Sequence, residues 1–401
     1  MLDIDGLNLK HATVKKEFSM FSKKLHRIAK ALSIIICIFM ISSGIAADDA
    51  PDVIRSGRNG KPIVGVYYYP WYRQPTQWRR VMRRHLKEPQ EPKVGLYRSD
   101  DPNVVAEHIA QSIRGGISFW AVSWWGPEQH CDVTFRNAIL KHPDAGKLKY
   151  VILYESTGRL RRFSHPSYAR WIPDLTYLKE NYFDHPHYLR IDGKPVIFVY
   201  LTREYFRNKG HDALKEMRET FPQIYLVGDD VFGAGYKSEW AKHFDAVTAY
   251  DVYGQSVGRF GGTRKAIEFL ADNYRHAKAR ANAVGTAFMP TIAPGYNDTA
   301  VRKGHPGRAR YFIDVQGSKE GDIFRAMIRE VALPHLDPRC GNMMMITSFN
   351  EWYEDTQIEA TSGTTRPSDT DDSETGTYFT GGDRYVDYGH LYLDILRETL
   401  R

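Results

Sequence analysis

Eight short apolar runs alternate with segments of helical periodicity from residue 60 to the end of the chain. Each run is bounded by glycine, proline, aspartate or asparagine, as is typical of parallel strands that are buried on both faces. The runs cover residues 63–69, 117–124, 150–154, 196–200, 224–227, 246–250, 287–292 and 343–349. The clearest helical segments are 102–114, 264–283 and 390–400. This alternation constrains the fold more than any other feature of the sequence.

Eight strands that are each followed by a helix predict an α/β fold, a (β/α)8 TIM barrel, with one barrel domain over residues 60–401. A doubly wound open sheet alternates strands and helices in the same way and is the alternative that the pattern leaves open. The hydrophobic content of 42% is sufficient for such a core and excludes a disordered or fibrous chain.

The first 47 residues have a different character. Seven basic residues precede a mainly apolar stretch at 31–45, and the small residues Ala46 and Ala47 follow it. The pattern predicts a signal peptide over 1–47, a linker over 48–59, and a secreted or periplasmic protein. An uncleaved membrane anchor is the alternative, and whether Met1 or Met20 starts the chain stays open.

The basic charge of the chain lies largely in this leader. Its removal takes away seven basic and three acidic residues, so the formal charge falls from +7 to +3. A nearly balanced chain argues against a nucleic-acid partner, and we interpret the four arginines within 79–84 as a solvated helix face. We expect a monomer with no stable membrane association once the leader is removed.

Aromatic and acidic residues stand where the predicted strands end, which is where a barrel of this type carries its active site. They include Tyr68, Tyr69, Trp71, Tyr72, Trp124, Trp125, Tyr154, Glu155, Tyr200, Asp229, Asp230, Tyr250, Asp251, Tyr253, Tyr296, Asn297 and Asp298. Aromatic faces with carboxylates and amides between them suit a sugar, whose ring stacks while its hydroxyls form hydrogen bonds. The alternative for each aromatic residue is a role in capping the barrel core.

The last strand is followed by a pair of glutamates, Glu351 and Glu354. On a helical or turn-like backbone, residues three apart share a face with about 5–6 Å between their Cβ atoms. Two carboxyls at such a separation suit retaining glycoside chemistry, in which one is ionised while its neighbour keeps a proton. We expect the adjacent Asp355 to strengthen the repulsion within the pair.

Other site chemistries lack their sequence signals. The chain contains no Cys-x-x-Cys, no P-loop, no Gly-x-Ser-x-Gly and no His-Glu-x-x-His, and the glycines at 233 and 235 do not continue into a dinucleotide loop. His185 and His187 are interpreted as part of a polar turn. We therefore expect neither a cofactor nor a metal. Cys131 and Cys340 could form a disulfide or remain free thiols.

Four motifs resemble those of glycoside hydrolase family 99, the endo-α-mannosidases and endo-α-1,2-mannanases. Tyr-Tyr-Pro-Trp-Tyr at 68–72 looks like the first motif, and Ser-Trp at 123–124 is similar to the second. Pro-Gly-Tyr at 294–296, with Asp298, Thr299 and Arg302, resembles the loop after the seventh strand. Ile-Thr-Ser-Phe-Asn-Glu-Trp at 346–352 resembles the most specific motif, and the likeness extends from the first strand to the last helix.

The resemblance implies an endo-acting, retaining cleavage of an α-mannoside in an oligosaccharide or polysaccharide. Glu351 would be the general base on the sugar's own 2-hydroxyl, which forms a 1,2-anhydro sugar, and Glu354 would be the general acid and then the base. The substrate-binding residues implied are Tyr69, Trp124, Glu155, Tyr250, Tyr296 and Asn350. A non-catalytic carbohydrate-binding barrel and a polysaccharide-assembly protein are the alternatives.

Two residues depart from the family pattern inside its last motif. Tyr353 and Asp355 stand where the family has histidine and glycine. Loss of the histidine beside the acid/base changes the surroundings of the cleaved bond, so the preferred sugar can differ from mannose. If the glycine position requires a positive φ, aspartate is among the residues that tolerate it.

Overall fold

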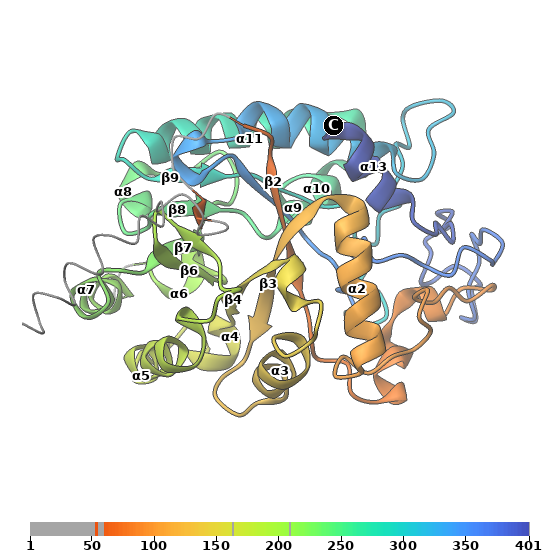
Figure 1. Cartoon of the computed structure of the whole chain (residues 1–401). Helices are drawn as coiled ribbons and strands as arrows, with labels where there is room; N and C mark the ends of the chain where they lie inside the picture. Colours follow the sequence, from red (N-terminus) through yellow and green to blue (C-terminus); the bar gives the residue numbers. More distant parts are fainter. Residues whose placement is uncertain (1–52, 55–59, 163, 208–209, 401) are drawn as a thin grey trace, which may run out of the picture. The chain divides into compact units, whose positions relative to one another are not determined.

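A ring of parallel strands lies at the centre of the computed structural model, which describes residues 53–54, 60–162, 164–207 and 210–400 (Figure 1). The predicted signal peptide and most of the predicted linker lie outside the described residues. The strands are β2 (Ile63–Tyr68), β3 (Ile117–Trp124), β4 (Lys149–Tyr154), β6 (Lys194–Val199), β7 (Tyr225–Asp229), β8 (Ala246–Thr248), β9 (Ala287–Met289), β10 (Thr291–Ile292) and β11 (Met343–Ile346). They follow the order β10-β11-β2-β3-β4-β6-β7-β8-β9.

The ring closes through Pro290. β9 pairs with β8 on one side, β10 pairs with β11 on the other, and only Pro290 separates the two short strands. Proline has no N–H for a sheet ladder, so the seventh predicted strand is split there. The Pro290 carbonyl still accepts a bond of 2.9 Å from the N–H of Met345. The eight-stranded barrel is confirmed and the open sheet is excluded.

Helices surround these strands, and Figure 1 shows α2, α11 and α13 outside the ring. The three predicted helices are α2 (Pro102–Gly115), α11 (Arg264–Asn282) and α13 (Leu391–Thr399), each within one residue of its expected ends. The other α-helices are α3 (His130–Thr134), α4 (Ser156–Arg159), α5 (Trp171–Leu178), α6 (Thr202–Tyr205), α7 (Gly210–Thr220), α8 (Ser238–Ala241), α9 (Val252–Gln255), α10 (Val257–Phe260) and α12 (Asp322–Ala326).

Short 3-10 and π-helical turns complete the connections. The 3-10 turns are η1 (Pro75–Arg80), η2 (Met82–Arg84), η4 (Ala145–Lys147), η7 (Leu333–His335) and η8 (Pro338–Cys340), and the π turns are η3 (Phe135–Ile139), η5 (Lys179–Phe183) and η6 (Met327–Ala332). In the described part of the chain, no helix is both long and apolar enough to span a membrane.

Side chains fill the barrel, so its interior is a packed core. A Cβ atom on Gly65 of β2 would lie 2.1 Å from the Phe119 ring of β3, and glycine is therefore required where this ring crosses the strand. Outside the ring of strands, Tyr68 and Trp120 stack with their centroids 4.0 Å apart and reach His108 and Ser112 of α2. Cys131 and Cys340 are both buried as free thiols.

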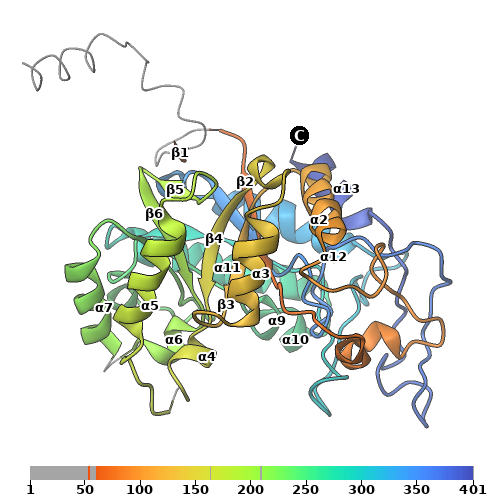
Figure 2. The ribbon, with the colours of Figure 1, turned by 60° about the horizontal axis from the view of Figure 1, so that its bottom comes forward.

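The two ends of the barrel differ. At the amino ends of the strands, β5 (Arg190–Ile191) pairs with β6 and with β1 (Val53–Ile54), so two residues of the predicted linker form a strand. The carboxyl ends lead into α4, α6, α9 and α10, which lie at the end away from β1 and β5 (Figure 2). This end carries the predicted site.

The arginines of 79–84 are not all solvated, and that prediction is partly wrong. Arg79 and Arg80 are exposed on η1, whereas the Arg83 side chain in η2 is fully buried. Arg83 forms an ion pair with Asp355, 272 positions further along the chain. A charge pattern along the sequence contains no information about such a distant partner.

Candidate active site

The chain turns sharply after β11 and presents Glu351 and Glu354. The N–H of Thr356 donates to the carbonyl of Glu351 over 3.3 Å, which closes the turn. The N–H of Asn297, from the loop after β10, donates to the carbonyl of Glu354 over 2.8 Å. The predicted turn-like backbone is confirmed, and it is fixed at the carboxyl ends of two neighbouring strands.

The Glu351 side chain is nearly enclosed. The residue is 3% exposed, and its Oε1 accepts a hydrogen bond of 2.9 Å from the N–H of Tyr353. Burial raises the pKa of the Glu351 carboxyl well above its usual range, and the charges of Glu354 and Glu155 act in the same direction. The charge of Arg302 and the bond from Tyr353 oppose these effects.

The Glu354 carboxyl has a cationic partner. Its Oε1 accepts a hydrogen bond of 3.0 Å from Nη1 of Arg302, which also contacts Asp298 and donates to Oη of Tyr296 over 2.9 Å. Burial raises the pKa of Glu354, and Arg302 opposes the shift. Since both glutamates resist ionisation and repel each other, the pair retains a proton more readily than two free glutamates would.

A cavity of about 320 Å³ opens beside Glu354. Aromatic residues from several strand ends line it, namely Tyr200, Tyr250, Tyr253 and Tyr296, together with the charged or titratable residues Arg203, Asp251, Arg302, His305 and Glu354. The rings of Tyr253 and Tyr296 are stacked with centroids 4.0 Å apart. Aromatic walls with fixed polar groups between them are the lining expected of a sugar site.

Only some of the predicted substrate-binding residues line the cavity. Tyr250 and Tyr296 line the cavity. The Tyr69 hydroxyl lies 2.5 Å from the Tyr250 hydroxyl. The Glu155 carboxyl accepts a bond of 2.6 Å from the Ser123 hydroxyl, and burial raises its pKa to about 8.

Trp124 and Asn350 are fully buried and have partners within the protein. The indole N–H of Trp124 donates to Asp132 over 2.8 Å. The Asn350 amide accepts from the N–H of Tyr69 over 2.8 Å and donates to its carbonyl over 3.1 Å, which joins the end of β2 to the turn after β11. Substrate contact by these two residues stays a prediction.

Two cavity residues, Arg203 and His305, were not predicted. Nη1 of Arg203 lies 3.1 Å from both carboxylate oxygens of Asp229, and Nδ1 of His305 lies 2.6 Å from Asp298. Both lie beyond a strand end and belong to no recognisable motif. Their place in the cavity is therefore visible only in the folded chain. The acids that hold them are among the strand-end residues that the sequence singled out.

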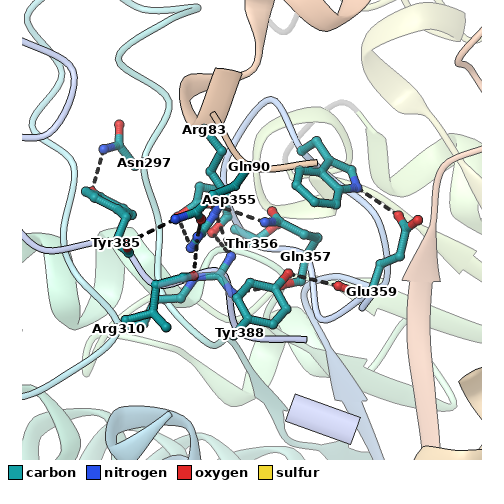
Figure 3. Close-up of polar contacts among 12 residues, drawn as sticks. Arg83, Gln90, Asn297, Arg310, Asp355, Thr356, Gln357, Glu359, Tyr385 and Tyr388 are labelled. Carbon is teal, nitrogen blue, oxygen red and sulfur yellow. Dashed lines mark hydrogen bonds and ion pairs between the residues drawn. The ribbon is translucent and has the colours of Figure 1, made fainter. Parts of the chain in front are cut away.

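The Asp355 side chain lies against Arg83 and Arg310 (Figure 3). Its carboxylate accepts bonds of 2.6 Å from Nε of Arg83 and 3.2 Å from Nη2 of Arg310. These two guanidinium groups hold the pKa of Asp355 below its usual range despite burial. The predicted tolerance of a positive φ is confirmed, since Asp355 has φ 50°. We expected Asp355 to repel Glu351 and Glu354, but its charge is paired with these two arginines, and the acids that raise the pKa of Glu354 are Asp298 and Asp251.

A second cavity of about 410 Å³ shares His305 with the first. It is lined in part by Tyr378, which is 42% exposed, and by Arg308 and Asp383. The Tyr378 hydroxyl accepts a bond of 3.3 Å from the N–H of Gly304, which joins the loop after β10 to the 376–383 segment. Within the described ranges, no cluster of three or more histidine, cysteine or acidic side chains is placed to hold a metal ion.

Comparisons with known proteins agree with this architecture. The chain is 23% identical over 335 residues to a glycoprotein endo-alpha-1,2-mannosidase of Xenopus laevis, which is 74% of this chain and 69% of that protein. It is 24% identical to a glycoprotein endo-alpha-1,2-mannosidase-like protein of Mus musculus, over 80% of this chain and 74% of that one.

Solved structures have the same fold. The endo-alpha-mannosidase of Bacteroides thetaiotaomicron superposes with a TM-score of 0.55 at 22% identity, covering 84% of this chain and 98% of that one. A protein described as glycoside hydrolase-like gives a TM-score of 0.57 at 17% identity, covering 86% of this chain and 95% of that one. The sequence profile of Glycosyl hydrolase family 99 matches residues 88–374, which is most of the chain, and the protein therefore belongs to this family of glycoside hydrolases.

Proposed function

We propose that the protein is a retaining, endo-acting α-mannosidase that cleaves an oligosaccharide or polysaccharide. The observation that carries the proposal is the turn after β11, which places Glu354 at the wall of an aromatic, charged cavity and holds the buried Glu351 three residues before it. The names of the relatives, endo-alpha-1,2-mannosidase among them, support this substrate class.

The proposed reaction forms a 1,2-anhydro sugar. Glu351 takes the proton of the sugar's 2-hydroxyl, whose oxygen attacks C1 while Glu354 gives its proton to the departing glycosidic oxygen. In the second step, Glu354 takes a proton from water, the water oxygen bonds to C1, and the C1–O2 bond breaks. O2 then regains its proton from Glu351. Two displacements at C1 retain the α configuration.

The surroundings of the two carboxyls support these roles. Neither carboxyl bonds to carbon in this scheme, so both need only to be positioned for proton transfer. A shared proton leaves one carboxylate to act as base while its neighbour acts as acid. Arg302 contacts Glu354 and can stabilise its ionised form after the proton leaves.

The two cavities support an endo mode of cleavage. A chain of sugar residues that continues past the cleaved bond needs space beyond the cavity beside Glu354. The second cavity, reached past His305, offers this space, with the exposed Tyr378 ring as a stacking surface and Asp383 and Arg308 as polar groups.

The sugar at the cleaved bond depends on residues next to the acid pair. Tyr353 lies one position before Glu354, and its ring lies 5.7 Å from that of Trp71 and under the Arg80 guanidinium at 5.3 Å. This aromatic surface stands where the family has a histidine. We propose mannose as the sugar because of the names of the relatives, and digestion of α-mannans would determine the linkage.

The domain assignment belongs to the same proposal. A signal peptide over 1–47 would export an enzyme whose barrel domain covers 60–401, and the partner at the site would be a glycan rather than nucleic acid. The near-neutral mature charge supports this assignment. We further propose that the exported enzyme acts as a monomer.

Substitution of each glutamate tests the function. E351Q and E354Q keep the side-chain size and remove proton transfer, so turnover of an α-mannan or an activated α-mannoside should fall by a factor of about 10² to 10⁴. E219Q is the matched control, because Glu219 lies at an exposed position on α7, far from both glutamates in the sequence. This variant should keep wild-type turnover. Glycan binding without product in the wild-type protein would instead support the non-catalytic binding barrel.

A further inference from the structure

Four buried charged side chains lie behind the catalytic turn. The side chains of Arg83 and Arg310 are 0% exposed, that of Asp355 is 1% exposed and that of Glu320 is 5% exposed. Two positive and two negative charges balance each other, which is the condition for burying them. We call Arg83, Arg310 and Asp355 the clamp, and Figure 3 shows the contacts among the three.

Arg83 joins the turn to a distant part of the chain. Its Nε donates to Oδ1 of Asp355 over 2.6 Å, and its Nη1 donates to the carbonyl of Val386 over 2.9 Å and contacts Gln90. The guanidinium also lies 5.1 Å from the centre of the Tyr388 ring. Its donors therefore fix the Asp355 carboxylate relative to η2 and to the segment before α13.

Arg310 holds the backbone where the turn ends. Its Nη2 donates to the carbonyl of Asp355 over 2.7 Å, and its Nη1 donates to the carbonyl of Gln357 over 3.0 Å. The planar fork of a guanidinium fits two acceptors at fixed separation, and lysine cannot reproduce it. Arg310 thus fixes the chain directly after Glu354.

The backbone conformation of Asp355 explains why the turn needs the clamp. A φ of 50° lies in the left-handed region, which is unfavourable for a residue with a Cβ atom. This conformation sends the Asp355 side chain into the clamp while its neighbour Glu354 faces the cavity. Two consecutive side chains are thereby directed to opposite sides of the turn.

A purely stabilising role explains this arrangement less well. Buried ion pairs contribute little net stability, because the cost of desolvation offsets much of their attraction. What the clamp provides is a single geometry, since three charged groups from distant segments meet only when the turn has this one shape.

We propose that the clamp positions the Glu354 carboxyl for proton transfer, with Asp355 as its central positioning residue. The inference rests on the proposed function, because it assigns a purpose to the geometry of Glu354. In the first step Glu354 must direct a proton at the glycosidic oxygen, and a displacement of about 1 Å costs much of the rate. Asp355 itself touches neither the cavity nor the reacting atoms.

The test compares two leaving groups in the full-length protein. A manno-oligosaccharide needs protonation of its departing sugar, whereas the corresponding manno-oligosaccharyl fluoride loses fluoride without it. Azide is present in both assays because it attacks C1 without a general base. For D355N, which keeps the size and tolerance of positive φ, kcat on the oligosaccharide should fall about tenfold, with KM nearly unchanged.

The fluoride assay separates positioning from folding. Turnover of the fluoride by D355N should stay within about twofold of wild type, since this substrate does not need the proton of Glu354. R310K is the second variant and should show the same selective loss, because lysine cannot bind both carbonyls. D337N is the matched control. Asp337 is buried and accepts from the N–H of Phe288 over 3.0 Å at the other end of the barrel, so D337N should lower stability without a leaving-group effect.

Each result has a defined meaning. Equal losses on both substrates in D355N and R310K, or no loss on either, would overturn the positioning role while leaving the α-mannosidase assignment in place. Failure of the wild-type protein to turn over either substrate would overturn the proposed function and the catalytic role of the clamp together. A selective loss on the oligosaccharide supports the clamp.

Discussion

The Arg302 guanidinium lies 3.0 Å from the Glu354 carboxylate. Arg302 is fixed from its other side by Asp298, which is fully buried, while the Arg302 side chain itself is 55% exposed. Two opposing effects therefore act on Glu354: burial and the charges of Asp298 and Asp251 favour its neutral form, and the Arg302 cation favours its charged form. In the proposed mechanism, the balance between these effects should set the alkaline limit of activity.

Removal of Arg302 should shift this range upward. In R302Q the pKa of Glu354 rises, so the group keeps its proton to higher pH, and the alkaline limb of kcat/KM should move up. R302K keeps a positive charge and should show a smaller shift. The measurement is kcat/KM on a manno-oligosaccharide as a function of pH, and an alkaline limb that moves down in R302Q would contradict the account.

Glu155 should make the stability of the protein depend on pH. Its pKa is about 8 in the folded protein and 4.5 for a free glutamate, so the folded state binds the proton more tightly. The resulting stabilisation is complete below pH 4.5 and is lost as the pH rises to about 8, by at most about 1.4 kcal/mol per pH unit.

The variant E155Q removes this titration. Urea unfolding at pH 5 and pH 8 should show a smaller decrease in the free energy of unfolding for E155Q than for wild type, and E219Q should follow wild type. An equal decrease in wild type and E155Q would show that Glu155 ionises normally in the folded state.

The second cavity should matter only for long substrates. Y378A removes the exposed ring beside it, so KM for a manno-oligosaccharide that extends past the cleaved bond should rise severalfold, since each stacking contact is worth about 0.5–1.5 kcal/mol. A short activated α-mannoside should be hydrolysed as by wild type. An equal change on both substrates would place Tyr378 outside the substrate path.

Cys131 and Cys340 should resist alkylation in the native protein. Both thiols are buried, and burial raises the pKa of Cys340 to about 12 and that of Cys131 further, so neither forms the reactive thiolate near neutral pH. Mass spectrometry after iodoacetamide treatment should find both residues labelled only in denaturant. Labelling of neither in denaturant without a reductant would indicate a disulfide.

The strands were predictable because buried parallel strands leave apolar runs between turn residues. The ends of the strands were less predictable. β7 continues to the polar residue Asp229, two positions beyond the end of the apolar run 224–227. The Asp229 carboxylate accepts from the N–H groups of Leu201 and Tyr250, which makes a charged residue favourable inside the sheet. Such long-range partners do not appear in a local pattern.

The turn that carries Glu351 and Glu354 was predictable because the two residues are neighbours in sequence. The partners of Asp355 were not predictable, because one backbone angle decides where its carboxylate points. The positive φ of Asp355 turns its carboxylate toward Arg83 and Arg310, so a residue expected to repel the pair instead anchors the turn.

The anomeric form of the first product distinguishes retaining from inverting cleavage of the α-mannoside. Proton NMR of an α-mannan digest, recorded before mutarotation, reports the configuration at the cleaved carbon, and chromatography of the same digest reports the product lengths. We predict that the α anomer appears first, in oligosaccharides released from within the chain, and that E354Q releases them at least about 10²-fold more slowly. The β anomer as first product, or release of single sugars from the chain end, would contradict this prediction.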